Sequence, residues 1–245
     1  MSSELLTEAE LNFFLIGEGK VGTAFSNFFN IRKIAVKKCR DRSILNETGF
    51  VFVAVSDEST SEVILKISNN NPQLNIIHFS AATTFKDDNI FLFHPYSSIS
   101  ESTDISEIIF TLWGQKNHSV ETALENTGLQ FIYAGTAPSP FYHISAVISG
   151  NFTQYFFLTA FEMLKKEGFS DSDSRKLIGQ LMKSSISNII ESGVKGITGP
   201  ASRGDIAVIK KETEQMKTVN KDLSIVFNNI NKLISTAVKN GNILK

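Results

Sequence analysis

The chain has little of several things that other classes of protein need. Cys39 is the only cysteine, and the formal charges nearly cancel, at −1 over 245 residues. One cysteine cannot form an intramolecular disulfide or a thiolate metal cluster. A near-neutral chain also lacks the basic surface that general nucleic-acid binding requires. We therefore expect no metal centre and no nucleic-acid partner.

Long apolar segments are missing as well. The sequence has no run of about 18 apolar residues, which predicts no membrane-spanning helix. Residues 1–10 carry three glutamates and lack the basic start and apolar centre of a signal peptide. The sequence therefore predicts a cytoplasmic protein with no membrane partner, and the single cysteine is consistent with a reducing compartment.

The first half of the chain alternates β and α signals. Short apolar runs predict strands at residues 12–16, 34–37, 50–55, 75–79, 91–93, 108–113 and 130–133. Helical patterns lie between several of them, at residues 21–29, 61–68 and 118–127. This alternation is typical of repeated β-α units with a largely parallel sheet.

After Gly135 the pattern becomes helical throughout. Ser139-Pro140 predicts the start of a helix of about 28 residues, and Gly168 its end. A second helix is expected to end at Gly193, a third to start near residue 206, and a fourth to cover residues 223–237. The predicted fold is α/β, with a Rossmann-type, mainly parallel sheet in residues 1–136 and an all-α C-terminal domain in residues 137–245.

The first predicted strand leads into the G-x-G-x-x-G sequence Gly17-Glu18-Gly19-Lys20-Val21-Gly22. Gly17 permits a tight turn, Gly19 lets backbone amides approach phosphates, and Gly22 lets the next helix pack closely. Lys20 and Val21 would open that helix, whose N-terminus favours an anion. We expect this turn to bind the pyrophosphate of a dinucleotide, because a strand precedes it and a helix follows.

Basic residues follow the second predicted strand. Lys37, Lys38 and Arg40 stand where NAD-binding domains place an acidic residue on the ribose 2′-hydroxyl. Positive charges there favour the 2′-phosphate of NADP. The alternative interpretation is a solvated basic turn.

Two serines follow the third and fourth predicted strands. Ligands of open α/β sheets lie beyond the carboxyl ends of the strands, so Ser56 and Ser80 are expected to face the cofactor. Helix capping is the alternative role for both.

Two histidines and an asparagine are candidates for the chemistry. His94 ends the fifth predicted strand, a good position for proton transfer near neutral pH, although a structural histidine is the alternative. His143 and Asn151 share one face of the long helix with the small residues Ala146 and Gly150. A ligand could approach that face closely; a polar surface face is the alternative.

A loop rich in glycine precedes the third C-terminal helix. Arg203 in this loop has the guanidinium geometry to hold a carboxylate or phosphate with two hydrogen bonds. The alternative is a simple helix entry, with Asp205 as the capping residue.

Together these segments resemble a bacterial family that joins a Rossmann-like domain of the deazaflavin-dependent NADP oxidoreductase type to a helical domain of unknown function. The matching motifs are residues 17–22, His94-Pro95, Tyr142-His143 with Asn151, and residues 198–200 with 203–205. The layout is also similar to that of pyrroline-carboxylate, ketopantoate and 6-phosphogluconate-type reductases, whose helical domains close the active-site cleft and often build dimers. The resemblance implies a homodimer. The basic residues after the second predicted strand make NADP the expected cofactor, ahead of NAD or a deazaflavin.

Two features depart from these families. Tyr96-Ser97-Ser98 stands where the resemblance implies Leu-Gln-Ser, and the Lys-x-x-x-Asn pair of several hydroxyacid dehydrogenases is missing from the long helix. The first departure makes substrate contacts at residues 96–98 uncertain. The second slightly favours a protein without catalytic activity.

We expect hydride transfer between NADP(H) and a small, acidic carbonyl, imine or hydroxy compound. In this interpretation His143 or His94 moves the proton, Asn151 donates to the oxyanion and Arg203 binds the acidic group. A nucleotide-binding sensor or scaffold is the alternative. Methyl transfer from S-adenosylmethionine is disfavoured, since that reading calls for an acid where Lys37 and Lys38 stand.

Overall fold

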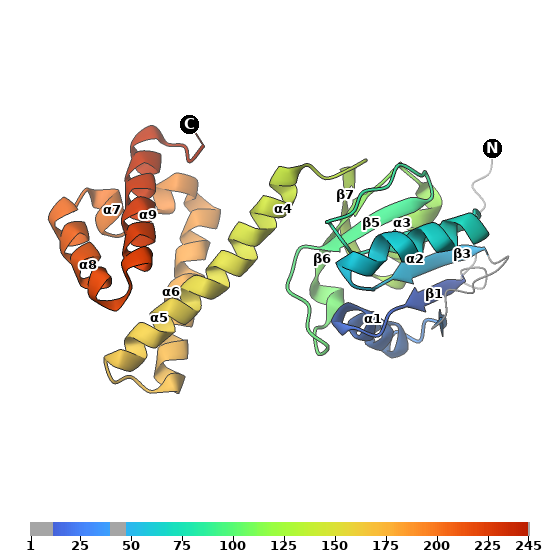
Figure 1. The fold of residues 1–245 in the computed structure, drawn as a ribbon, viewed down its shortest axis with the longest axis horizontal. Helices are drawn as coiled ribbons and strands as arrows, with labels where there is room; N and C mark the ends of the chain where they lie inside the picture. Colours follow the sequence, from blue (N-terminus) through green and yellow to red (C-terminus); the bar gives the residue numbers. More distant parts are fainter. Residues whose placement is uncertain (1–11, 40–47, 245) are drawn as a thin grey trace. The chain divides into compact units, whose positions relative to one another are not determined.

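The structure is a computed structural model, and it describes residues 12–39 and 48–244. The chain divides into two compact units, Met1–Thr153 and Gln154–Lys245 (Figure 1). The predicted domain boundary after residue 136 directly follows the last strand and stays a prediction. None of the described helices is long and apolar enough to cross a bilayer.

The first unit is built on one seven-stranded sheet. Its strands are β1 (Phe13–Ile16), β2 (Val36–Lys38), β3 (Gly49–Val53), β4 (Leu74–His78), β5 (Ile90–Pro95), β6 (Ile109–Trp113) and β7 (Gln130–Gly135). Their order across the sheet is β2-β1-β3-β4-β5-β6-β7, and every neighbouring pair is parallel except β5 and β6. The predicted Rossmann-type, mainly parallel sheet is confirmed.

Helices cover both faces of the sheet. They are α1 (Lys20–Ile31), α2 (Asp57–Asn70) and α3 (His118–Thr127). In β1, Phe13 and Leu15 belong to one hydrophobic cluster, whereas Phe14 and Ile16 belong to the other. All four residues are buried, because successive side chains of a strand point to opposite faces and both faces are covered.

The two clusters differ in composition. The cluster under α1 and α3 is rich in phenylalanine, and its rings lie in contact; those of Phe93 and Phe110 are stacked with centroids 4.4 Å apart. The cluster under α2 is mostly isoleucine and valine. Burial of each large side chain contributes about 1.5–3 kcal/mol, so this sheet is a rigid base for the loops at its carboxyl edge.

A helix begins at the end of the first unit. Ser139 is the N-cap residue and Pro140 the first helical residue of α4 (Pro140–Val147), as predicted. A five-residue π-helix, Ile148–Phe152, follows, and α5 (Thr153–Lys166) continues the chain. Widened π turns are uncommon and are frequent at functional sites. The predicted helix of about 28 residues is therefore confirmed, but with an irregular centre.

The second unit is all-helical in its described part. After α5 come α6 (Asp171–Ser192), α7 (Pro200–Arg203), α8 (Ile206–Val219) and α9 (Lys221–Asn240). Ser170 caps α6 through a bond from the Asp173 amide, and Asn220 caps α9 through a bond from the Leu223 amide. The all-α C-terminal part is confirmed.

Candidate functional site

The glycine turn between β1 and α1 is fixed by two close backbone approaches. Gly17 has φ +114°, and a Cβ at this position would overlap with the carbonyl group of Ala54. A Cβ at Gly22 would overlap with the carbonyl oxygen of Gly17. These two glycines are therefore required by the protein's own packing.

Gly19 differs from both. Its φ of −73° suits any residue, and a Cβ built there would meet no atom of a non-neighbouring described residue within 4 Å. Gly19 is the N-cap residue of α1, whose first turn carries neither a capping side chain nor an acidic residue. The N–H groups at this helix end remain available to an anion, and nothing in the fold itself requires glycine at position 19.

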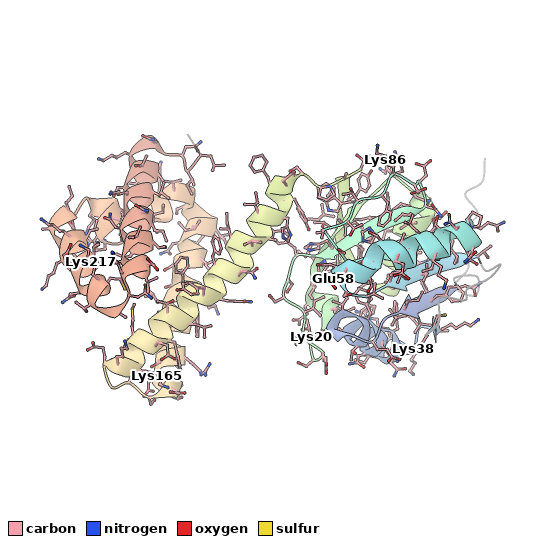
Figure 2. All side chains as sticks on the ribbon, viewed as in Figure 1. Lys20, Lys38, Glu58, Lys86, Lys165 and Lys217 are labelled. Carbon is pink, nitrogen blue, oxygen red and sulfur yellow. The ribbon has the colours of Figure 1, made fainter. Side chains whose placement is uncertain are left out.

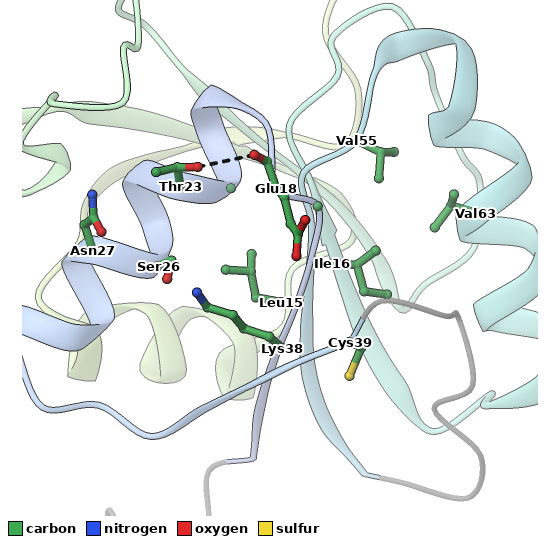
Figure 3. A pocket seen from close by; sticks show the side chains of 12 residues that line it. Leu15, Ile16, Glu18, Thr23, Ser26, Asn27, Lys38, Cys39, Val55 and Val63 are labelled. Carbon is green, nitrogen blue, oxygen red and sulfur yellow. Dashed lines mark hydrogen bonds between the residues drawn. The ribbon is translucent and has the colours of Figure 1, made fainter.

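A cavity of about 740 Å³ adjoins the turn (Figure 3). Gly17 and Gly22 line it together with Thr23, Ser26 and Asn27 of α1, Lys38 and Cys39 at β2, and Val55 and Val63. In Figure 3 the Lys38 side chain extends toward α1, where Ser26 lies. Glu18 lines it as well, so the cavity combines a glycine turn, hydroxyl groups, the Lys38 ammonium group and the Glu18 carboxylate.

The predicted cofactor residues do not all reach this cavity. Lys37 instead lies over the ring of Phe14, with its Nζ 5.7 Å from the ring centroid. Lys20 opens α1 and Val21 follows it, but neither lines the cavity, whereas Lys38 at the end of β2 does (Figure 2). Arg40 lies outside the described residues.

The two serines are placed differently. Ser56 is the exposed N-cap residue of α2; its hydroxyl donates to Ser59 Oγ at 3.1 Å and accepts no capping bond from the N–H groups of the helix. Ser80 is buried, and its Oγ has no hydrogen-bond partner among the described residues. Neither serine lines the cavity beside the glycine turn.

A second cavity, of about 410 Å³, brings together three of the predicted catalytic residues. His94 enters it from the carboxyl end of β5, His143 from α4, and Asn151 from the π-helix. Ala146 and Gly150 also line it, so the predicted small-residue face does border open space. We call this cavity the histidine pocket; its complete lining is His94, Pro95, Tyr96, Ser97, Ser98, His143, Ala146, Val147, Ser149, Gly150 and Asn151.

His94 is held by residues that the sequence analysis missed. Its Nδ1 lies 2.8 Å from Tyr142 Oη, which in turn lies 2.6 Å from Thr111 Oγ1. Trp113 Nε1 donates to the same threonine oxygen at 3.0 Å. The sequence does point to Tyr142, because it precedes His143 in the motif that carries the family resemblance. No sequence pattern points to Thr111 and Trp113, because only the pairing of β6 with β5 brings them beside His94.

The environment of His94 disfavours its charged form. Burial lowers the pKa of His94 below its ordinary value, and the nearby His143 lowers it further, while Asp57 at the start of α2 opposes both effects. Burial likewise raises the pKa of Tyr142, and its hydrogen-bond contacts with Thr111 and Trp113 oppose this shift. His94 is therefore mainly neutral at pH 7.

Arg203 lies in the second unit. Its guanidinium bonds to Asp205 Oδ2, with Nε at 3.0 Å and Nη2 at 2.9 Å. Asp205 precedes α8 but makes no side-chain capping bond, so the carboxylate pairs with arginine rather than capping the helix. An acidic ligand at Arg203 would have to compete with this carboxylate.

Solved structures with this fold come from several organisms. A Thermotoga maritima protein is 21% identical over 94% of this chain and 99% of its own, with a TM-score of 0.72. A Plasmodium falciparum pyrroline carboxylate reductase with NADP bound is 14% identical over 92% of this chain and 100% of its own, at 0.61. An imine reductase from Myxococcus stipitatus in complex with NADP⁺ is 11% identical over 94% and 95%, at 0.66. These likenesses show a shared fold.

Among curated proteins, none matches the sequence. A family model described as a domain of unknown function, DUF2520, matches residues 112–234, which is half of the 245-residue chain. The match begins in β6, includes the whole helix that carries Tyr142, His143 and Asn151, and extends into α9. The chain therefore belongs to the DUF2520 family.

Proposed function

We propose that the first unit binds NADP(H) at the glycine turn. The observation that carries this proposal is the contrast among the three glycines: close backbone approaches require Gly17 and Gly22, whereas a Cβ at Gly19 would meet no atom of the described residues within 4 Å, which leaves room for a ligand close to the backbone. A phosphate at the start of α1 would meet free N–H groups and the positive end of the helix dipole. The adjoining cavity of about 740 Å³ has room for the rest of a nucleotide.

Lys38 supports NADP over NAD. Its side chain lines the cavity at the end of β2, where a dinucleotide-binding sheet contacts the adenosine ribose. An ammonium group attracts a 2′-phosphate, whereas the ribose of NAD is usually held by a carboxylate. The reductases from Plasmodium falciparum and Myxococcus stipitatus, which share the fold, were both solved with NADP.

We further propose that the histidine pocket is the substrate site of an oxidoreductase. Bound NADP(H) would supply or accept the hydride. His94 and His143 would exchange the proton, and Asn151 would donate a hydrogen bond to the substrate oxygen or nitrogen. The lining contains hydroxyl, amide and imidazole groups but no carboxylate, which suits a small, neutral or acidic carbonyl, imine or hydroxy compound.

Two measurements test this proposal. Calorimetric titration with NADPH, NADH, a reduced deazaflavin and S-adenosylmethionine should give tight binding of NADPH, weaker binding of NADH, and none of the other two. Absorbance of NADPH should then fall with a member of a panel of keto acids and cyclic imines.

The variants His94→Gln and His143→Gln separate the roles of the two histidines. The variant that lacks the proton-transferring residue should lose about 100-fold or more in turnover with unchanged NADPH affinity. Absence of NADPH binding would contradict the proposal.

A non-catalytic nucleotide sensor is the second candidate. The observation in its favour is that none of the described residues lining the histidine pocket is a lysine, aspartate or glutamate, so the acid-base groups among them are histidine and tyrosine. A sensor would bind NADPH with the same affinity but oxidise it with no member of the panel. It would also respond to NADPH with a change in association with a partner protein.

We propose that the protein is a homodimer. On α6 the apolar residues Leu177 and Leu181 are 47% and 68% exposed, although side chains of this kind are normally covered in a stable assembly. Light scattering after size-exclusion chromatography should give twice the chain mass. The double variant Leu177→Asp with Leu181→Asp should give the monomer, whereas Ser187→Asp, a charge added at a polar position of α6, should not. A wild-type monomer would contradict the proposal.

A further inference from the structure

Four groups around His94 form a closed hydrogen-bond ring. It runs from His94 Nδ1 to Tyr142 Oη at 2.8 Å, from there to Thr111 Oγ1 at 2.6 Å, and back to the His94 carbonyl oxygen at 3.3 Å. Trp113 Nε1 joins the ring from outside, 3.0 Å from Thr111 Oγ1. The ring therefore ties one nitrogen of the imidazole to the backbone of the same residue.

Two of the groups have fixed hydrogen-bonding roles: the Trp113 indole and the His94 carbonyl. An indole N–H can only donate, and a backbone carbonyl can only accept. If Nδ1 of His94 carries the proton, it donates to Tyr142 Oη, Tyr142 donates to Thr111 Oγ1, and Thr111 donates to the His94 carbonyl. All four bonds, including the one from Trp113, are then made at once.

The opposite tautomer makes fewer bonds. If Nδ1 lacks the proton, Tyr142 must donate to Nδ1, so it can no longer donate to Thr111 and can only accept from it. Thr111 has a single proton, so it bonds either to Tyr142 or to the His94 carbonyl, and one contact of the ring is lost. Each lost neutral bond costs about 0.5–1.5 kcal/mol, which favours the proton on Nδ1.

We propose that Tyr142 is a positioning residue that, with Thr111, fixes His94 as the Nδ1–H tautomer, so that Nε2 is the nitrogen that exchanges protons in the histidine pocket. Its catalytic meaning rests on the proposed oxidoreductase function. Nε2 makes no hydrogen bond with the described part of the chain and is not among its buried unpartnered atoms, so a ligand in the pocket can reach it.

The ring orders the proton step. If bound NADP⁺ accepts the hydride from the carbon of a substrate alcohol, the substrate O–H bond would break and an Nε2–H bond would form on His94. The resulting imidazolium keeps its Nδ1–H bond to Tyr142, and no bond in the ring has to reverse. In reduction the same Nε2–H returns the proton. His94 thus changes charge without moving.

The charged and titratable groups around His94 come from three elements. His143 and Tyr142 lie on α4, Asp57 begins α2, and Tyr96 follows β5 and packs on the Tyr142 ring with centroids 5.7 Å apart. Only Asp57 favours the imidazolium. The acceptor oxygen of Tyr142 adds to this, because a hydrogen bond from a charged donor is stronger than one from a neutral donor.

Nitrogen-15 NMR of the full-length protein tests the proposal. Long-range proton–nitrogen spectra report which nitrogen of each of the four histidines carries the proton, and His94→Gln assigns the His94 signals. The wild type should show Nδ1–H for His94 above its pKa. Tyr142→Phe removes only the hydroxyl and should move the proton to Nε2 and lower the pKa of His94.

Controls keep the result specific. Tyr133→Phe removes a hydroxyl that donates to the Gly114 carbonyl at 3.0 Å, outside the ring, and should leave His94 unchanged. Thr111→Val should act like Tyr142→Phe, and serves if that variant fails to fold. An Nε2–H tautomer in the wild type, or Nδ1–H retained in both ring variants, would overturn the proposal. NADPH titration of the wild type separately tests the proposed function, since the tautomer does not depend on it.

Discussion

The glycine turn and the histidine pocket are built in different ways. At the turn, close backbone approaches decide the geometry: Gly17 lies against Ala54, directly after the neighbouring strand β3, and Gly22 lies against Gly17. In the pocket, side chains from β5, β6 and α4 meet although they lie far apart in the sequence. The turn therefore tolerates no side chain at Gly17 or Gly22, whereas a site built from side chains can lose one group and keep its shape.

The largest expected loss of stability comes from a substitution in the glycine turn itself. Gly17→Ala places a Cβ against the carbonyl of Ala54 at a φ of +114°, so the variant should lose more than about 3 kcal/mol of stability or fail to fold. Urea unfolding followed by circular dichroism measures this loss. A variant of wild-type stability would show that β1 and β3 do not approach as described.

A buried histidine outside the pocket gives the next effect. His78 at the end of β4 has its pKa lowered from 6.5 to about 4, mainly by burial, with a backbone bond at Ser80 opposing the shift. The unfolded chain therefore binds the proton first as the pH falls. Stability is complete above pH 6.5 and declines toward pH 4, by about 3 kcal/mol at 1.36 kcal/mol per pH unit.

Urea unfolding at pH 7 and pH 4 measures this decline. His78→Met keeps the volume and removes the titration, so its stability should fall less over the same range. His94→Gln should change the acid response less than His78→Met does, because His94 is less buried. An equal acid response in the wild type and His78→Met would contradict this assignment and place the titration elsewhere.

A smaller effect on cofactor affinity is expected to distinguish the two lysines of β2, Lys37 and Lys38. Lys38 lines the cavity, whereas Lys37 lies over Phe14. Lys38→Ala should weaken NADPH binding about 10-fold, or about 1.4 kcal/mol, and leave NADH binding unchanged. Lys37→Ala, the matched control, should change neither. Calorimetry with both cofactors decides, and equal losses in both variants would mean a general charge effect.

The turn was predictable from sequence and the ring around His94 was not. The strand, the glycine spacing and the following helix are contiguous, so local physics places residues 17–22 correctly. His94, His143 and Asn151 were each chosen for their chemistry, and the fold brings them to one pocket. Thr111 and Trp113 have ordinary positions on a predicted strand. Their role depends on the antiparallel register in which Thr111 faces His94, which no local pattern records.

Sequence patterns also could not determine the partners of Lys37 and Asp205, because these depend on three-dimensional packing. Both Lys37 and Lys38 were expected at the cofactor, but successive residues of a strand point to opposite faces, and only Lys38 lines the cavity. Asp205 was expected as a helix cap, yet its carboxylate pairs with Arg203 two residues earlier. Three-dimensional packing decides which side chain of an edge strand faces the cavity and which partner a carboxylate takes.

The central claim is that Gly19 is kept for a ligand and not for the fold, and Gly19→Ala tests it most directly. Among the described residues, a Cβ there meets no atom within 4 Å, and the φ of −73° is ordinary, so the free energy of unfolding should stay the same or rise by up to about 1 kcal/mol. The NADPH dissociation constant, measured by calorimetry, should increase about 10-fold or more. Unchanged NADPH affinity in a stably folded Gly19→Ala variant would contradict the account.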